Sequence, residues 1–260
     1  MRKTLAILAA VLVVLGTSMG CEGRKKTQDG QEEVDTPQIT LPESDIFSGE
    51  YEVEGPDYEA ILKITKANQG YHLEWTFPDG DKHYGKGIAL DGILGAVYDV
   101  GDGSSSGMVA YKKSGDGITG LWTPTEGGSV SCEKTADEPQ ISLGRLDVRG
   151  DYEVEGTDED STEYTGILNI EEKGPVFSAN WTSGPNEIHG TGFVLDDVLI
   201  LNYGNPDGVG IVVYEIHGTQ LTGFWLFCPY ENLSTPYPVS LATEKAKKVT
   251  SGTKVSEEDD

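Results

Sequence analysis

The chain has 260 residues, which exceeds one small domain and suits two domains of about 100 residues each. It carries 44 acidic and 19 basic residues, for a formal net charge of −25. A surface of that charge repels polyanions over a Debye length of about 10 Å, which excludes nucleic acid as a partner.

The first twenty residues have the pattern of an export signal. Two basic residues precede an apolar stretch, Leu5–Leu15, which is too short to cross a hydrocarbon core of about 30 Å as a helix. Small residues then lead to Cys21. This end resembles a bacterial lipoprotein signal, which implies that Cys21 is diacylated and that its lipid inserts into a membrane. The alternative is ordinary cleavage near Gly20, which would release a freely secreted protein.

The rest of the chain divides into two similar units. Gly49-Glu-Tyr-Glu-Val-Glu-Gly55 recurs as Gly150-Asp-Tyr-Glu-Val-Glu-Gly156, and later aromatic and aliphatic positions recur in the same order. The sequence therefore predicts a tandem duplication flanked by polar, aperiodic segments. The expected divisions are a signal peptide at 1–20, a flexible tether at 21–45, repeat 1 at 46–135, a linker at 136–146, repeat 2 at 147–244 and a charged disordered tail at 245–260.

Each unit consists of eight short runs with β-strand character. In Tyr51-Glu-Val53 and Leu62-Lys-Ile64 the apolar residues alternate with charged ones, which is the period of a strand with one solvated face. Turn sequences such as Pro78-Asp-Gly80 separate the runs, and the last run of the second unit is placed at Tyr237–Thr243. No segment of the mature chain has a helical period.

These patterns predict an all-β fold of two tandem, small, antiparallel up-and-down barrels. Each barrel is calycin-like, has eight strands and contains no significant helix. Closure into a barrel removes exposed strand edges, and glycines inside strands suit its bends. A two-sheet sandwich is the alternative architecture.

The repeated pattern resembles a family of exported bacterial β-domain proteins, some of which are labelled fibronectin-binding protein. The resemblance rests on Gly-x-Tyr-x-Val-x-Gly, a later Trp, Gly-x-Gly, and (Ile/Leu)-x-Gly-x-Trp in each unit. The family's closing motif is present only in part, with Glu133 in the first unit and Thr243-Glu244 in the second. Glycines and aromatic residues specify a fold better than a chemistry, so the family's binding label does not by itself identify a partner.

No catalytic constellation stands out, so we expect no enzymatic activity, no metal site and no cofactor. The four histidines lack ligand spacing, although His83 and His189 both precede the Gly-x-Gly strand of their repeats. Six recurring aromatic residues are candidates for lining a ligand cavity, with core packing as the alternative. They are Trp75, Trp122, Trp181, Trp225, Tyr111 and Tyr214.

The two remaining cysteines, Cys132 and Cys228, are a candidate disulfide between the units. Free thiols are unusual in an exported protein, although the two positions are not equivalent in the repeat. Two free, buried thiols are the alternative.

The anchor, the tether and the duplication predict a non-enzymatic exported lipoprotein. Its expected role is that of a surface or periplasmic binding module with a protein or glycan partner, for which tandem copies raise avidity. Two other roles stay open. One is a calycin-like carrier of a small apolar ligand, which needs an open barrel interior, and the other is an envelope structural protein.

Overall fold

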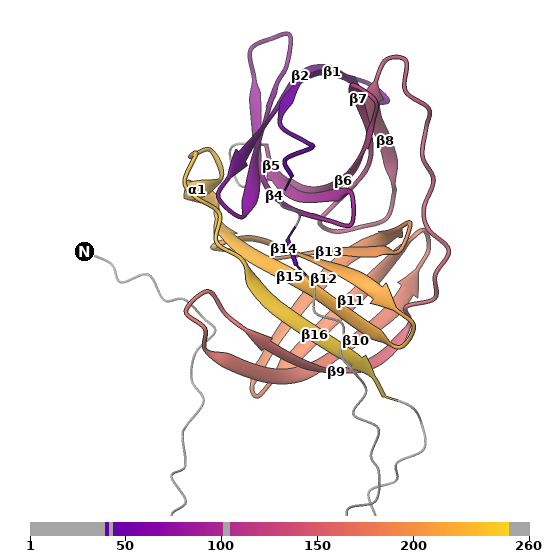
Figure 1. The fold of residues 1–260 in the computed structure, drawn as a ribbon, viewed down its shortest axis with the longest axis vertical. Coiled ribbons are helices and arrows are strands. Elements are labelled where there is room, and N and C mark those ends of the chain that lie inside the picture. Colours follow the sequence, from indigo (N-terminus) through magenta and orange to yellow (C-terminus); the bar gives the residue numbers. More distant parts are fainter. Residues whose placement is uncertain (1–39, 42–43, 101–104, 250–260) are drawn as a thin grey trace, which may run out of the picture. The chain divides into compact units, whose positions relative to one another are not determined.

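The computed structural model describes residues 40–41, 44–100 and 105–249, and nearly all of its elements are β-strands (Figure 1). The first eight strands close into one antiparallel barrel and the next eight into a second. The predicted tandem barrels are thereby confirmed. The signal segment and Cys21 lie outside the described residues. Within the described ranges, no helix has both the length and the apolar character needed to span a membrane.

The sixteen strands follow one another around the barrels in chain order. The first barrel contains β1 (Gly49–Glu54), β2 (Glu59–Ala67), β3 (Gly70–Thr76), β4 (Lys82–Leu90), β5 (Ile93–Asp99), β6 (Ser106–Ser114), β7 (Gly117–Pro124) and β8 (Ser131–Thr135). The second contains β9 (Gly150–Thr157), β10 (Glu163–Lys173), β11 (Val176–Ser183), β12 (Asn186–Leu195), β13 (Val198–Asn205), β14 (Gly208–His217), β15 (Gln220–Pro229) and β16 (Ala242–Lys248).

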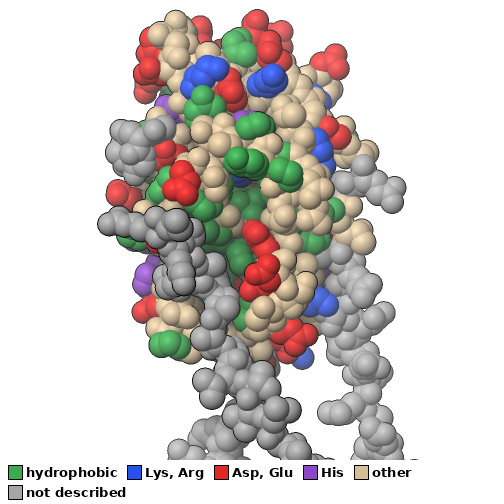
Figure 2. Space-filling view, turned by 90° about the vertical axis from the view of Figure 1, so that its left-hand side faces the viewer, with side chains coloured by type: hydrophobic (Ala, Val, Ile, Leu, Met, Phe, Trp, Pro, Cys, Tyr) green, Lys and Arg blue, Asp and Glu red, His purple; other side chains and the backbone are tan. Residues whose placement is uncertain are grey.

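Strands β1 and β2 show why the chain forms barrels with a solvated outer surface. Tyr51, Val53, Leu62 and Ile64 are buried, whereas the charged residues between them are exposed. In a strand, successive side chains point to opposite faces, so this alternation sends one set inward and the other to solvent. Figure 2 shows acidic side chains spread over one face of the molecule, with few basic ones among them.

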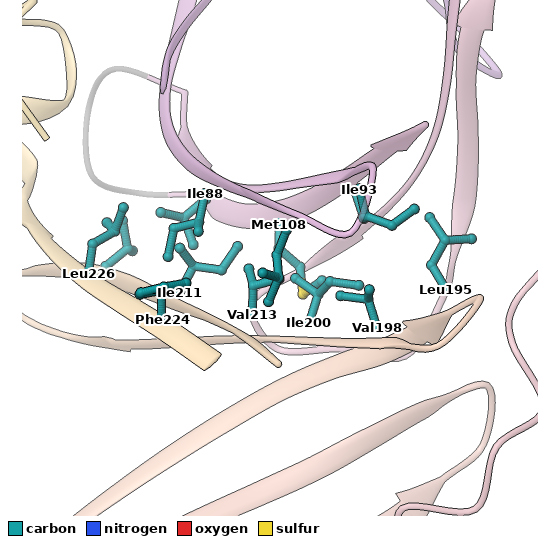
Figure 3. Close-up of a cluster of buried hydrophobic side chains, with 14 of the residues drawn as sticks. Ile88, Ile93, Met108, Leu195, Val198, Ile200, Ile211, Val213, Phe224 and Leu226 are labelled. Carbon is teal, nitrogen blue, oxygen red and sulfur yellow. The ribbon is translucent and has the colours of Figure 1, made fainter. Parts of the chain in front are cut away.

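Strands β4–β7 and β12–β15 also bury their outer faces, because the two barrels pack against each other there (Figure 3). Met108 of β6 and Ile211 of β14 belong to one hydrophobic cluster that both barrels share. A Cβ atom on Gly95 would lie 2.9 Å from the side chains of Ile200 and Val213, so the strands approach closely. Burial on both faces explains why runs such as Val209–Tyr214 are almost continuously apolar.

The end of the second barrel differs from the prediction. The last strand is β16, so residues 245–248 belong to the barrel and not to a charged tail. Ala242, Glu244 and Ala246 point inward, while Thr243 and Lys245 between them are exposed. The inward and outward positions alternate as in other strands. The inward residues are small or charged, however, so a pattern of hydrophobicity does not reveal this strand.

The segment before β16 holds the insertion that lengthens the second repeat. It begins with the single-turn helix α1 (Tyr230–Leu233), the only helix among the described residues. Val239 then forms an isolated parallel bridge with Asn68 of the first barrel, and its backbone N–H donates to Ala67 O at 2.9 Å. The insertion therefore packs on the other barrel, and β16 begins five residues later than the predicted strand.

Candidate functional site

The first barrel holds one carboxyl group in its interior. Glu133 on β8 is 2% exposed. Its Oε2 atom accepts a hydrogen bond from the Tyr58 hydroxyl at 2.5 Å, and its Oε1 atom accepts one from Trp75 Nε1 at 3.2 Å and another from the Tyr111 hydroxyl. Three neutral donors thus surround a buried acidic group.

The second barrel repeats this arrangement. Glu244 on β16 accepts hydrogen bonds from the Tyr164 hydroxyl at 2.6 Å, from Trp181 Nε1 at 3.1 Å and from the Tyr214 hydroxyl. Glu133 lies opposite Gly120 and Glu244 lies opposite Gly223 in the strand register, which makes the two closing strands equivalent. The insertion before β16 had obscured this equivalence in the sequence.

Glycines in the neighbouring strands let the donor rings reach the carboxyl group. A Cβ atom on Gly120 would lie 2.4 Å from the Tyr111 ring, and one on Gly85 would lie 3.1 Å from the Trp75 ring. Each of these rings therefore lies across a position without a side chain. The same pairing of ring and glycine covers all six donors: Tyr58 on Gly55, Trp75 on Gly85, Tyr111 on Gly120, Tyr164 on Gly156, Trp181 on Gly190 and Tyr214 on Gly223.

Burial dominates the electrostatics of these groups. It raises the pKa of the Glu133 and Glu244 carboxyls, and the three hydrogen bonds donated to each carboxyl act in the opposite direction. Burial, reinforced by Glu133, raises the pKa of Tyr98 to about 12 and raises that of Tyr111 as well. The tyrosines therefore stay protonated at neutral pH and can donate hydrogen bonds.

A cavity of about 270 Å³ opens beside Glu133 in the first barrel. Its wall consists mainly of aromatic rings, and no Lys or Arg is among the described residues that form it. The lining residues are Tyr58, Trp75, Phe77, His83, Tyr98, Val100, Val109, Tyr111, Trp122 and Glu133.

Two polar groups of the wall are not used by the Glu133 network. Among the described residues, none accepts a hydrogen bond from Trp122 Nε1, although that nitrogen is buried. The His83 ring packs on Phe77 with ring centroids 4.5 Å apart, and burial lowers the pKa of this imidazole, which keeps it neutral at pH 7. Trp225 Nε1, the counterpart in the second barrel, is likewise buried without an acceptor among the described residues, so this feature belongs to both barrels.

The second barrel has different side chains at three of the equivalent wall positions. Register places Ile188 opposite Trp181, where the first barrel has His83 opposite Trp75. The counterparts of Phe77 and Val100 are Ser183 and Asn205. In addition, Phe227 stacks on Tyr203 in the second barrel at a centroid distance of 6.3 Å. Pro124 occupies the place of Phe227 in the first barrel, so the two interiors are not interchangeable.

Comparison with known proteins adds no relative. No protein-family model matches the chain, and no curated protein matches its sequence. The functional interpretation therefore starts from the geometry.

The structure places the six predicted aromatic residues in two groups. Trp75, Trp122 and Tyr111 line the cavity of the first barrel. Trp181 and Tyr214 bind Glu244 in the second barrel, and Trp225 is buried beside Tyr164, with ring centroids 6.3 Å apart. Sequence reasoning did not assign a site role to five of the lining residues that matter most here, namely Tyr58, Phe77, His83, Tyr98 and Glu133.

The structure does not pair the two cysteines or the two histidines that the sequence offered as candidate pairs. Cys132 and Cys228 are both free thiols in the structure, so the candidate disulfide is absent, and both contact the cluster between the barrels. His83 lines the cavity, but His189 is exposed and pairs with Asn180 in the register, so the two histidines are not equivalent. Within the described ranges, no three His, Cys, Asp or Glu side chains gather in a group that could hold a metal ion.

Proposed function

We propose that this chain is a non-enzymatic, exported binding protein, anchored through a lipid on Cys21, whose first barrel takes a small ligand. The observation that carries this proposal is the aromatic cavity beside Glu133. Ligand cavities are typically concave, mostly apolar and provided with a few placed polar groups, with volumes from about 300 Å³ upward. The cavity of the first barrel, at about 270 Å³, is just below that range, which favours a small ligand.

The interior cavity favours a carrier over a module that binds a protein or glycan on its outer surface. Large exposed hydrophobic side chains are few among the described residues, and two of them, Ile61 and Ile167, come from different barrels. Single exposed hydrophobic residues are normal on soluble surfaces and do not indicate a docking patch. The aromatic side chains around Glu133 and Glu244 point inward, and Tyr237 is the exposed aromatic residue among those described.

A pair of matched variants tests the carrier function. Val109 lines the cavity, and Val212 is its buried counterpart in the second barrel. Val109→Phe should fill the cavity and abolish binding, whereas Val212→Phe should perturb the core to a similar degree and retain binding. Native mass spectrometry of the full chain, purified from its own membrane fraction, would detect a bound ligand, and tryptophan fluorescence would follow titration with small aromatic and aliphatic compounds. Unchanged binding by Val109→Phe would refute the assignment.

The same mass measurement tests the anchor. A chain that begins at Cys21 and carries a diacyl mass is the expected result. An unmodified chain that begins near residue 21 would show a secreted protein and would leave the cavity proposal intact.

A further inference from the structure

The wall of the cavity presents six aromatic rings around one small volume. They are Tyr58, Trp75, Phe77, Tyr98, Tyr111 and Trp122. Tyr58 meets Phe77 at a centroid distance of 5.8 Å, and Trp75 meets Tyr98 at 5.9 Å, both with strongly inclined planes. Rings inclined to one another enclose a space from several sides. The negative faces of aromatic rings attract cations, and cages of such rings hold quaternary ammonium groups.

The base of the cavity adds an acidic group without a basic partner. Glu133 receives hydrogen bonds only from neutral donors, and no Lys or Arg is among the described lining residues. Burial favours the protonated form of Glu133. A cation beside this carboxyl group would stabilise its ionised form in the low-dielectric interior, whereas an anion would oppose ionisation. The formal net charge of −25 acts in the same sense at long range, because it draws cations toward the protein.

From these two observations we propose that the cavity binds a small quaternary ammonium compound. This inference rests on the proposed function and narrows it to a ligand class. The ammonium group lies among the six rings, and Glu133, ionised when the cation is bound, is its counter-charge.

The decisive experiment compares two compounds of the same shape. Choline has a trimethylammonium group, and 3,3-dimethylbutan-1-ol has a neutral carbon in the place of that nitrogen. Calorimetric titration of the full chain should show choline binding about tenfold tighter or more, with one site per chain. Equal affinities would overturn the cation proposal while supporting a cavity for neutral ligands. Failure of both compounds would also overturn it, and retained binding of other apolar compounds would then preserve the proposed function.

Matched glutamine variants test the counter-charge. Glu133→Gln should lower choline affinity about tenfold with little change for the neutral alcohol, whereas Glu244→Gln removes the corresponding group of the second barrel and should leave both affinities unchanged. Equal choline binding by both variants would count against the role of Glu133.

One further variant keeps the proposal testable if Glu133→Gln does not fold. Phe77 is only partly buried and donates no hydrogen bond to Glu133, so Phe77→Leu removes one ring of the cage and leaves the three donors in place. It should reduce the preference for choline over the alcohol. An unchanged choline preference in Phe77→Leu would contradict a cage around the cation.

The trimethylammonium group occurs both in free solutes and in lipid headgroups, and sedimentation with vesicles separates these sources. The test uses the chain with Cys21→Ser, which cannot carry the proposed lipid. Its co-sedimentation with phosphatidylcholine vesicles, but not with phosphatidylglycerol vesicles, would indicate a headgroup. Binding of free choline without co-sedimentation would indicate a soluble solute. Either result supports the ligand class, and binding of neither form contradicts it.

Discussion

At the scale of single residues, a carboxyl group such as Glu133 can lie inside a barrel only when donors surround its oxygen atoms. Tyr58, Trp75 and Tyr111 supply those donors, and the duplicate around Glu244 repeats them. Because the network occurs in both barrels, it is a property of the fold. The copy around Glu133 also borders the cavity of the first barrel.

Removing a single donor should destabilise the protein. Tyr111→Phe and Tyr214→Phe each leave a buried carboxyl oxygen with one hydrogen bond fewer, so we expect each to lower the free energy of unfolding by about 1–3 kcal/mol. Urea unfolding of the full chain measures the change. The exposed Tyr237 provides the control, since Tyr237→Phe should have almost no effect. A cost for Tyr111→Phe no larger than the control would show that the hydrogen bond contributes little.

The buried carboxyl groups also predict how stability depends on pH. Burial raises the folded-state pKa of Glu133 and Glu244 above the value in the unfolded chain, near 4.3. The folded protein therefore holds these protons more tightly, and the associated stability is lost as the pH rises through the folded-state pKa. Tyr58, Tyr98 and Tyr111 face Glu133, and their raised pKa values keep them protonated throughout.

We accordingly expect the free energy of unfolding to fall as the pH rises above the unfolded-state pKa of these carboxyl groups, and to fall less in the double variant Glu133→Gln/Glu244→Gln. Glu74 acts in the opposite sense, because the hydrogen bond from Lys82 lowers its pKa and its contribution disappears only at lower pH. Urea titrations across the pH range check this. Identical slopes for the wild type and the double variant would contradict the prediction.

At the scale of the strand, glycine and aromatic residues act as pairs. The Tyr111 ring crosses β7 at Gly120, the position that lies opposite Glu133 on β8. A side chain at Gly120 would push the ring away from the carboxyl group. This explains why the repeat keeps glycines beside its tryptophans and tyrosines.

Gly120→Ala should therefore cost about 1–3 kcal/mol of stability, since the new methyl group would lie 2.4 Å from the Tyr111 ring. Gly204→Ala is the matched control in β13, because there the nearest neighbour of an added Cβ is 3.5 Å away. Thermal unfolding of both variants tests the difference. Equal losses would show that the ring contact does not determine the effect.

The sequence allowed the strands to be predicted better than the site. Alternation in β1 and β2 and the glycine turns between strands are local signals, so the two barrels could be recognised. Glu133 and Glu244 gave no such signal. In an acidic chain, a glutamate is predicted to be exposed to solvent unless the residues around it in space are known. The usable signal was that both repeats end on an inward glutamate, and the insertion before β16 disguised it.

At the scale of the whole molecule, the described barrels share one hydrophobic cluster. The contact uses β4–β7 of one barrel and the equivalent strands β12–β15 of the other. The sequence did not predict whether the two repeats pack against each other. The continuous apolar runs in β13 and β14 are typical of strands that are buried on both faces, but they do not identify the segment that covers the outer face.

The shared cluster predicts that its residues support both barrels together. Met108→Ala removes a fully buried side chain from the cluster and should cost about 2–5 kcal/mol. Calorimetry of the full chain should show both barrels melting at a lower temperature. A lowered transition for the first barrel alone would indicate that the barrels fold independently.

The face that each barrel buries is the same face of the repeated domain. Met108 and Ile211 occupy equivalent positions and meet in one cluster, as the two halves of a symmetric homodimer interface would. The two repeats of one chain thus form the contact that two separate copies would otherwise form. Because they are covalently linked, the contact is intramolecular and does not depend on the protein concentration. Two linked repeats need not be identical to form this contact. The interior of one barrel can therefore differ from that of the other.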